Sequence, residues 1–242
     1  MKFACKTDIG QVRRTNQDCY AVGELPAGVG WGVVCDGMGG ASGGNIASAT
    51  AVKTVSEKIA SNWRAGMGAN SIRNMLQSIA SAANINVFDM AQSVESLSGM
   101  GTTIVLTLVA EGVAHVVHAG DSRAYHITAD AITQITRDHS LVQDLVEQGR
   151  LTEEEAREHP RRNLITRALG VAELLDVEYS EVELGDEDAI LLCTDGLTGY
   201  VESQEMEEVI RTVPFAEWAE RLTKLANQKG GGDNITVVAI RN

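Results

Sequence analysis

Hydrophobic positions along this chain follow two rhythms. Short apolar or β-branched runs bounded by turn residues are typical of strands, and they occur at 1–7, 19–22, 31–35, 102–109, 113–117, 124–127, 131–135, 177–182, 189–193 and 235–241. Longer Ala-rich or amphipathic stretches predict helices at 45–63, from a cap at Asn70 or Ser71 to 93, and at 203–213 and 215–228. Shorter helices are predicted at 139–148 and, from a capping box of Thr152 and Glu155, up to Pro160.

The order of these elements predicts the fold. Strand pairs joined by tight turns indicate antiparallel sheets, and the long helices fall in two separate blocks. A doubly wound parallel sheet is disfavoured, because helices do not alternate with strands. We therefore expect an α+β fold, a four-layer α-β-β-α sandwich with two antiparallel sheets face to face and flanked by helix pairs.

The stretch 30–44, GWGVVCDGMGGASGG, joins a predicted buried strand to the first long helix. The strand ends at Asp36, and five of the next eight residues are glycine. Glycine allows another group to approach the backbone closely. The pattern therefore places a carboxylate at a strand end, beside backbone that can come close to a ligand.

Composition narrows the function. No Pro/Ser-rich linker divides the 242 residues, so we expect one domain over 1–242. The net charge of −13 argues against a general nucleic-acid or anionic-membrane surface, although one local basic pocket remains compatible with it. The four cysteines form no CxxC pair, and no apolar run approaches a membrane span, so we expect a cytoplasmic protein with small buried thiols.

Aspartates recur where apolar runs end beside glycine or a small polar residue: Asp36, Asp121, Asp195 and Asp233, with Asp18 as a fifth. Singly, each is explained by turn chemistry, since Asp-Gly is a common turn signal. Together, strand ends could bring these carboxylates to one edge of a sandwich, where a divalent cation would relieve their repulsion. All-oxygen ligands suit Mg²⁺ or Mn²⁺, whereas zinc is disfavoured because no HExxH or CxxC occurs.

Eight short motifs follow one another along the chain in the order found in a known family. The chain resembles bacterial metal-dependent serine/threonine phosphatases of the protein phosphatase 2C family, and the resemblance covers nearly its whole length. The motifs that carry it are Thr7–Gly10, Arg13–Asp18, Asp36–Gly40, Gly101–Thr103, Gly120–Arg123, Ile165–Gly170, Thr194–Leu197 and Gly232–Thr236.

This resemblance implies a sandwich of the predicted kind and assigns roles to single residues. It implies that Asp36 bridges two Mn²⁺ or Mg²⁺ ions, that the Gly37 carbonyl ligates one of them, and that Asp195 and Asp233 complete the site. Bacterial members often hold a third, weaker ion, for which Asp121 would act with Asp195. The resemblance further implies that Arg13 grips the substrate phosphate and that Asp18 and Asn234 support the metal ligands.

The implied reaction is hydrolysis of phosphoserine or phosphothreonine in proteins, by in-line attack of a water that bridges the two ions. Guanidinium suits the phosphate, because it makes bidentate contacts to oxygen. No covalent phosphoenzyme is needed, so Cys35 and Cys193 are interpreted as core residues. Substrates would be phosphoproteins made by a bacterial Ser/Thr kinase, and we expect a monomer.

Two departures from the family pattern matter. Many members carry Glu where this chain has Gln17, and animal members carry a candidate acid, His, where Met38 stands. Methionine cannot donate a proton, so the leaving oxygen would be protonated by water at the metals. Histidines 115, 118 and 126 are expected to be structural, whereas His139 and His159 are weaker candidates for substrate contact.

Residues from about 142 to 170 resemble the family's flap beside the active site. The alternative is a solvated helical excursion. The pair Arg161 and Arg162 could bind phosphopeptides, but plain surface charge is the preferred interpretation.

Parts of the sequence are compatible with two other functions. A non-catalytic phosphoprotein-binding module of the same fold is the main alternative, and it is disfavoured because the catalytic residues are all present. A nucleotide-binding protein is disfavoured because Ser42 interrupts GxGxxG and no GxxxxGK[ST] occurs.

Overall fold

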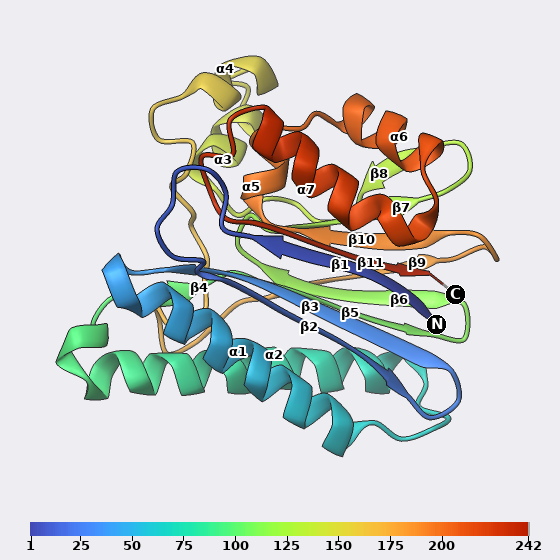
Figure 1. Cartoon of the computed structure of the whole chain (residues 1–242). Coiled ribbons are helices and arrows are strands. Elements are labelled where there is room, and N and C mark those ends of the chain that lie inside the picture. The colour runs from blue at the N-terminus through green and yellow to red at the C-terminus, as the bar shows by residue number, and fades with distance from the viewer. Residues whose placement is uncertain (242) are drawn as a thin grey trace.

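Two antiparallel sheets lie face to face between two layers of helices (Figure 1). This computed structural model describes residues 1–241, apart from the side chains of residues 41 and 42. Asn242, the last residue of the predicted domain, lies outside the described range. The predicted four-layer sandwich is confirmed.

Each sheet has a simple strand order, and every pairing is antiparallel. The first sheet runs β1 (Lys2–Asp8), β11 (Ile235–Arg241), β10 (Ala189–Cys193), β7 (Arg123–Ile127) and β8 (Ile132–Gln134). The second runs β2 (Asp18–Leu25), β3 (Val29–Met38), β5 (Ile104–Ala110), β6 (Val113–Ala119) and β9 (Glu178–Glu183), and the short β4 (Gly101–Thr102) pairs with β3.

The helices cover the outer faces of the sheets. Figure 1 shows α1 (Gly40–Asn62) and α2 (Ala69–Ser93) against the second sheet, and α6 (Ser203–Thr212) and α7 (Trp218–Gln228) over the first. The helices α3 (Leu141–Glu147) and α4 (Glu153–Glu158) form an excursion beside one end of the sandwich. The remaining helical turns are α5 (Asp195–Thr198) and two 3-10 turns at Glu95–Leu97 and Phe215–Glu217.

Aliphatic side chains fill the space between the sheets. The buried residues there include Val34, Val105, Val116, Ile190, Leu192 and Val238. Separate clusters lie under α1 and α2 and under α6 and α7. Three apolar interfaces therefore hold the four layers together.

Two helix starts differ from the prediction. The first long helix begins at Gly40, five residues before the expected Asn45. The second begins at Ala69 after Gly68, which makes no side-chain capping bond, so the predicted cap at Asn70 or Ser71 is wrong. At the first site, the close packing of β3 against the start of α1 overrides the low helix propensity of glycine. The capping box of Thr152 and Glu155 is confirmed.

The antiparallel register brings the ends of several strands to one edge of the sandwich. Asp18 opens β2 and lies opposite Asp36 near the end of β3. In the other sheet, Cys193 at the end of β10 lies opposite Val237 near the start of β11. The loops that follow or precede these strands therefore meet at the same edge.

Candidate metal centre

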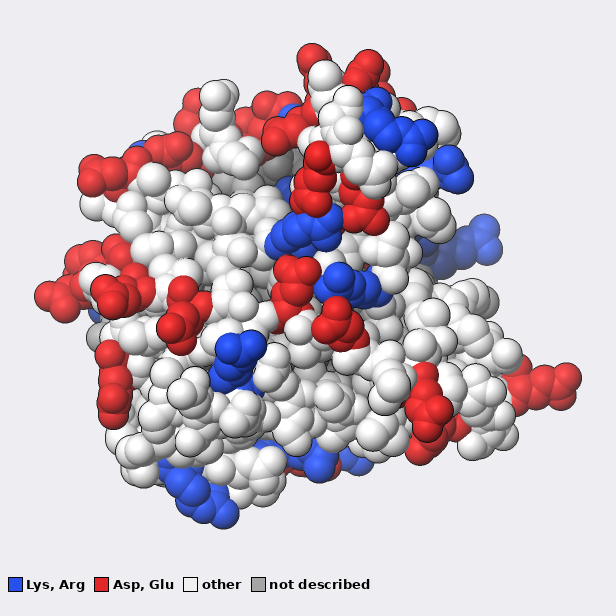
Figure 2. Space-filling model, turned by 180° about the vertical axis from the view of Figure 1, so that it is seen from behind, with Lys and Arg blue, Asp and Glu red and all other residues white. Residues whose placement is uncertain are grey.

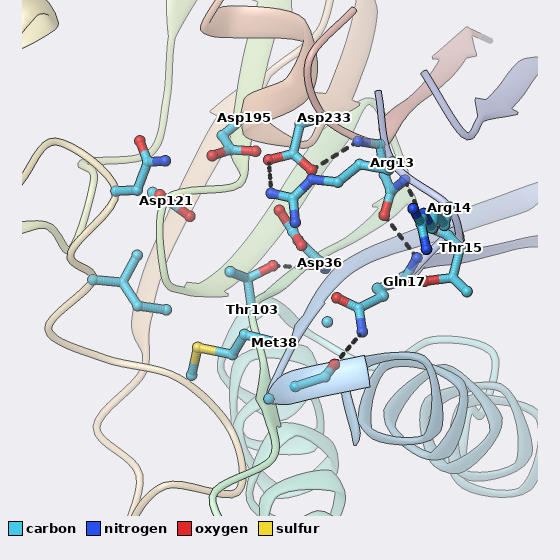
Figure 3. Close-up of a pocket in the computed structure, with 16 residues that line it drawn as sticks. Arg13, Arg14, Thr15, Gln17, Asp36, Met38, Thr103, Asp121, Asp195 and Asp233 are labelled. Atoms are coloured by element: carbon cyan, nitrogen blue, oxygen red, sulfur yellow. Dashed lines mark hydrogen bonds and ion pairs between the residues drawn. The ribbon is translucent and has the colours of Figure 1, made fainter. Parts of the chain in front are cut away.

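A pocket of about 490 Å³ opens where these loops meet. Four aspartates from four separate segments reach it: Asp36 from β3, Asp121 from the loop after β6, Asp195 from the first turn of α5 and Asp233 from the loop before β11. Figure 3 shows their carboxyl groups converging on one space, with Arg13 entering beside Asp233. The structure thus brings together the strand-end carboxylates that the sequence suggested.

Asp36 is held by its backbone, which leaves its carboxylate free to face the pocket. The Asp36 N–H donates to Thr103 Oγ1 at 2.9 Å, and the Asp36 carbonyl accepts from the Thr103 N–H at 2.9 Å. Thr103 Oγ1 also lies 2.7 Å from Ser122 Oγ, next to Asp121. Thr103 therefore fixes two of the four carboxylate-bearing segments relative to each other.

The backbone at Gly37 passes very close to its neighbours. A Cβ there would lie 2.0 Å from the Gly44 carbonyl oxygen and 2.6 Å from that of Gln17. Any side chain would force β3 away from the start of α1, so only glycine fits. The requirement explains the glycines on both sides of this strand-to-helix junction.

Burial and mutual repulsion disfavour the ionised form of these carboxylates. Burial, reinforced by the charges of Asp18 and Asp195, raises the pKa of Asp36 well above its usual range. Burial raises the pKa of Asp121 to about 8 and, with the Asp233 charge, also raises the pKa of Asp195. Among the described residues, Asp195 Oδ1 is buried without a hydrogen-bond partner. Oxygen donors crowded in this way fit a hard divalent cation.

Asp18 lies behind the pocket and links the two sheets. Its Oδ2 accepts hydrogen bonds from Thr194 Oγ1 at 2.9 Å and Thr236 Oγ1 at 2.7 Å. Its Oδ1 is buried and has no partner within residues 1–241. Burial raises the pKa of Asp18 to about 7, against the lowering effect of the two threonine bonds.

Asn234 fastens the loop that carries Arg13. Its Oδ1 accepts from the Gln17 N–H at 2.8 Å, and its Nδ2 donates to the carbonyls of Ile9 and Thr15, each at 3.0 Å. The loop between β1 and β2 is therefore tied to the residue that follows Asp233. Arg13 itself donates from Nη2 to Asp233 Oδ2 at 2.7 Å.

The two departures from the family pattern have clear positions. Gln17 lines the pocket but turns its Nε2 to the Gly40 carbonyl at 2.9 Å. Met38 lies on the side of the pocket away from Arg13 (Figure 3). Met38 and Ile165 both line the pocket, and neither side chain carries a proton donor.

The structure also locates the histidines. His115 contacts the Tyr179 hydroxyl, His118 the Arg137 carbonyl and His126 the Asp188 carboxylate. These contacts support the structural role predicted for the three histidines. His139 is fully buried, which makes the suggested substrate contact wrong. His159 Nδ1 accepts from the Arg161 N–H, and His159 is not among the residues that line the pocket.

Cys35 and Cys193 are poor nucleophiles, whereas Cys5 and Cys19, which were also predicted to be buried, are only partly buried. Cys35 and Cys193 are fully buried, and burial raises the pKa of Cys193 to about 12 and that of Cys35 well above its usual value. Both thiols therefore stay protonated at neutral pH.

Several residues that line or support the pocket had no predicted role. Thr103 belongs to a motif that carried the family resemblance, so a signal for it was present. Asn163 and Ile165 reach the pocket from the excursion after α4. Ile165 opens another of those motifs, whereas the hint for Asn163 was the predicted proximity of its segment to the active site.

Comparison with known proteins identifies the family. The protein phosphatase 2C profile matches residues 11–236. The chain belongs to the protein phosphatase 2C family. The serine/threonine phosphatase Stp of Listeria innocua is 37% identical over 239 residues, which cover 97% of this chain and 93% of that protein. The predicted enzyme class, a protein-serine/threonine phosphatase, is thereby confirmed.

Solved protein phosphatase 2C structures agree with this fold. The serine/threonine phosphatase of S. agalactiae aligns with a TM-score of 0.92 and 33% identity, covering 100% of this chain and 99% of that one. The catalytic domain of the phosphatase PstP, solved with two manganese ions, aligns with a TM-score of 0.86 and 33% identity over 98% of this chain and 96% of that one.

Proposed function

We propose that this protein hydrolyses phosphoserine and phosphothreonine in proteins, with two Mn²⁺ or Mg²⁺ ions held by Asp36, Gly37, Asp195 and Asp233. The observation that carries the proposal is the convergence of carboxylates at a pocket where Asp195 Oδ1 is buried without a hydrogen-bond partner among the described residues. Asp121, with Asp195, would hold a third ion. When bound, such ions supply an activated water at neutral pH and offset the charge of the phosphoryl group.

The residues of the chain orient the substrate. Arg13 is half exposed and already lies at the pocket, so its guanidinium can turn from Asp233 to the phosphate oxygens. Asn234 limits how far the Arg13 loop can move. Thr103 and Asp18 hold the segments that carry Asp36 and Asp195, which keeps the ligand oxygens in place before a metal binds.

Of the residues that the structure describes, those lining the pocket include no histidine, lysine, tyrosine or cysteine. Met38 stands where a candidate acid occurs in animal relatives, and its thioether has no proton to give. The pocket aspartates are assigned to the ions, so the leaving serine or threonine oxygen takes its proton from water in the pocket.

The proposal extends to the setting of the enzyme. We infer one domain with a flap at about 142–170 that acts as a monomer in the cytoplasm on substrates of a bacterial Ser/Thr kinase. The net charge of −13 supports a partner other than nucleic acid or an anionic membrane. Figure 2 shows acidic and basic side chains interspersed on one face, rather than a broad basic surface. Within residues 1–241, none of the helices combines the length and apolar character of a membrane span.

The test is turnover of a phosphothreonine peptide with Mn²⁺, with Mg²⁺ and with EDTA. We expect either ion to support hydrolysis and EDTA to abolish it. Asp36→Asn and Asp233→Asn should abolish metal-dependent turnover, whereas Asp130→Asn, at an exposed turn, should not. Full activity in Asp36→Asn would contradict the metal assignment. Peptide binding without turnover in the wild type would favour the binding-module alternative.

A further inference from the structure

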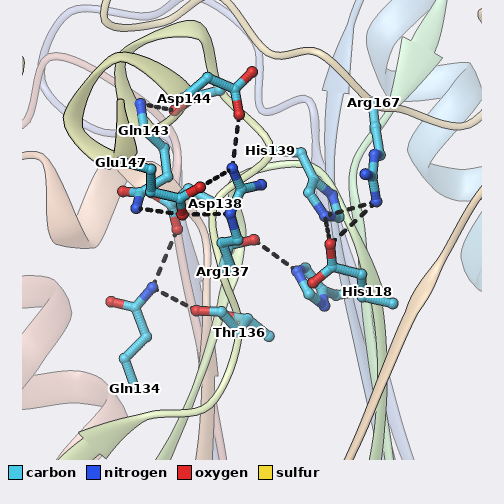
Figure 4. Close-up of polar contacts among 12 residues, drawn as sticks. His118, Gln134, Thr136, Arg137, Asp138, His139, Gln143, Asp144, Glu147 and Arg167 are labelled. Atoms are coloured by element: carbon cyan, nitrogen blue, oxygen red, sulfur yellow. Dashed lines mark hydrogen bonds and ion pairs between the residues drawn. The ribbon is translucent and has the colours of Figure 1, made fainter. Parts of the chain in front are cut away.

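His139 has no place in the reaction described above, yet it is fully buried just behind the pocket. Its ring lies flat against that of His118, with centroids 4.6 Å apart and planes 8° from parallel. Figure 4 shows the two rings together, with Arg167 on the far side of His139. A buried polar ring with defined partners on both edges usually fixes the position of something else.

The partners of His139 belong to two different pocket segments. The Gly120 N–H donates to His139 Nδ1 at 3.1 Å, and the His139 N–H donates back to the Gly120 carbonyl at 2.9 Å. On its other side, the His139 carbonyl accepts from the Thr166 N–H at 2.8 Å. Asp121, which follows Gly120, and Ile165, which precedes Thr166, both line the pocket.

The hydrogen bonds also define the state of the ring. An amide N–H can only donate, so Nδ1 carries no proton and the ring proton sits on Nε2. That nitrogen lies 3.0 Å from Glu178 Oε1 and 3.1 Å from Arg167 Nη1, which is itself a donor. The Nε2–H and the Arg167 guanidinium therefore share Glu178 Oε1 as their acceptor, and Arg167 Nη1 lies 3.2 Å from that oxygen. Glu178 thus orients the imidazole so that its acceptor nitrogen faces Gly120.

The next residue along the chain strengthens the same connection. Asp138 accepts a two-pronged contact from Arg123, with Nε to Oδ1 at 2.8 Å and Nη2 to Oδ2 at 2.7 Å. The short loop from Gly120 to Arg123 is therefore held at both ends by two consecutive residues. Asp121 lies between these two attachments.

We propose that His139 is a positioning residue that holds Asp121 at the metal pocket and ties it to the base of the 142–170 segment through Gly120 and Thr166. The metal role of Asp121 in this inference rests on the proposed function. The attachment of Gly120 and Thr166 to one residue does not depend on it. Supporting residues behind metal ligands commonly change metal affinity when they are removed.

Two substitutions of His139 test the hydrogen bonds of its two ring nitrogens one at a time. In His139→Asn, the side-chain oxygen can take the place of Nδ1 and accept from Gly120. In His139→Gln, the amide reaches the place of Nε2 and leaves the Gly120 N–H without its acceptor. His115→Gln is the matched control, because His115 is an equally buried histidine of the same region whose contact is Tyr179.

The first measurement is hydrogen exchange in the metal-free proteins. The segment containing Gly120 and Asp121 should exchange faster in His139→Gln than in the wild type, and near the wild-type rate in His139→Asn and His115→Gln. The second is Mn²⁺ titration by calorimetry. The weakest class of sites should lose about tenfold or more in affinity in His139→Gln, with the tighter sites unchanged.

Equal behaviour of the Asn and Gln variants in exchange and titration would overturn the proposal, as would a loss of thermal stability with neither readout changed. The wild type offers a test that needs no variant: the Gly120 amide should be protected to the same degree as the Thr166 amide. Rapid exchange at Gly120 alone would also overturn it. If the wild type shows no metal-dependent turnover, the proposed function fails, and the exchange data still decide whether His139 holds the loop.

Discussion

Arg13 and Asp233 form an ion pair of 2.7 Å at the mouth of the pocket, so the residue proposed to grip phosphate contacts a residue proposed to bind metal. Both side chains are partly exposed, and such pairs contribute little to stability. The pair is therefore easily exchanged for a phosphate on one side and a cation on the other.

If the pair is exchanged in this way, Arg13→Ala should weaken substrate binding without weakening metal binding. We expect the KM for a phosphothreonine peptide to rise roughly tenfold to a hundredfold, because hydrogen bonds to a charged group are lost. The Mn²⁺ affinity should not fall, since Asp233 loses a competitor. Steady-state kinetics and calorimetry test both. Arg14→Ala should cause a smaller rise in KM, and a marked loss of Mn²⁺ affinity in Arg13→Ala would contradict the exchange.

A substitution of Asp18 should change metal affinity without changing the stability of the fold. In Asp18→Asn, the amide oxygen can still accept from Thr194 and Thr236, so the link between the sheets should survive. The free carboxylate oxygen, however, is replaced by an N–H₂ group that repels cations. We expect Mn²⁺ affinity to fall about tenfold to a hundredfold, with no loss of thermal stability in the metal-free protein. Asp130→Asn is the control, and unchanged Mn²⁺ affinity in Asp18→Asn would show that this oxygen plays no supporting role.

Gly37 provides a prediction about packing. In Gly37→Ala, the new methyl group would overlap the Gly44 carbonyl, so the start of α1 must move away from β3. We expect a loss of about 1–3 kcal/mol in unfolding free energy, together with weaker Mn²⁺ binding. Gly185→Ala is the matched control, because Gly185 is exposed, its φ lies outside the left-handed region, and an added Cβ would meet its nearest neighbour, the Asp188 carboxyl group, at 3.5 Å. Equal urea-unfolding midpoints for the two variants would refute the close approach.

The same junction shows what local patterns miss. Glycine is a poor helix former, so the run up to Gly44 argued for a loop, yet α1 begins at Gly40. The approach of Gly37 to Gly44 depends on how β3 and α1 pack, which no periodicity records. The strands were predictable because their apolar runs reflect burial, and the aspartates because they end those runs.

Buried amides and the buried histidine were harder to foresee. Asn234 and His139 act through hydrogen bonds to backbone groups far away in the chain, and the sequence around them gives no sign of those partners. The family resemblance named Asn234 as a supporting residue but did not say what it supports. The metal-site aspartates were recognisable as a set, whereas their supports became apparent only from the contacts.

Asn84 is another such amide, and it predicts a sizeable loss of stability. Its Oδ1 accepts from the Gly170 N–H at 2.8 Å, and its Nδ2 donates to the carbonyls of Ala172 and Glu173. Asn84→Ala would leave these backbone groups without partners, at a cost of about 1–3 kcal/mol. Asn74→Ala, at an exposed position of the same helix, is the control. Chemical unfolding of both variants measures the difference, and equal stabilities would show that water replaces the amide.

His115 predicts how stability depends on pH. Burial lowers the pKa of His115 below its ordinary value of 6.5, while the Glu181 charge partly opposes the shift. Tyr179 is its hydrogen-bond partner, and Arg73 from α2 lies over the Tyr179 ring. As pH falls below about 6.5, the unfolded chain binds the proton before the folded one does, so the free energy of unfolding must decrease.

The variant His115→Gln cannot take up this proton. At pH 7.5 it should be less stable than the wild type, because the contact with Tyr179 is altered, but the gap should narrow between pH 7 and 5.5. Contributions from His118 and His139, whose pKa values burial also lowers, are common to both proteins and cancel in the difference. Urea unfolding at several pH values measures the gap. Parallel stability curves across this range would mean that His115 titrates alike in the folded and unfolded chain, and that its burial imposes no penalty on the charged ring.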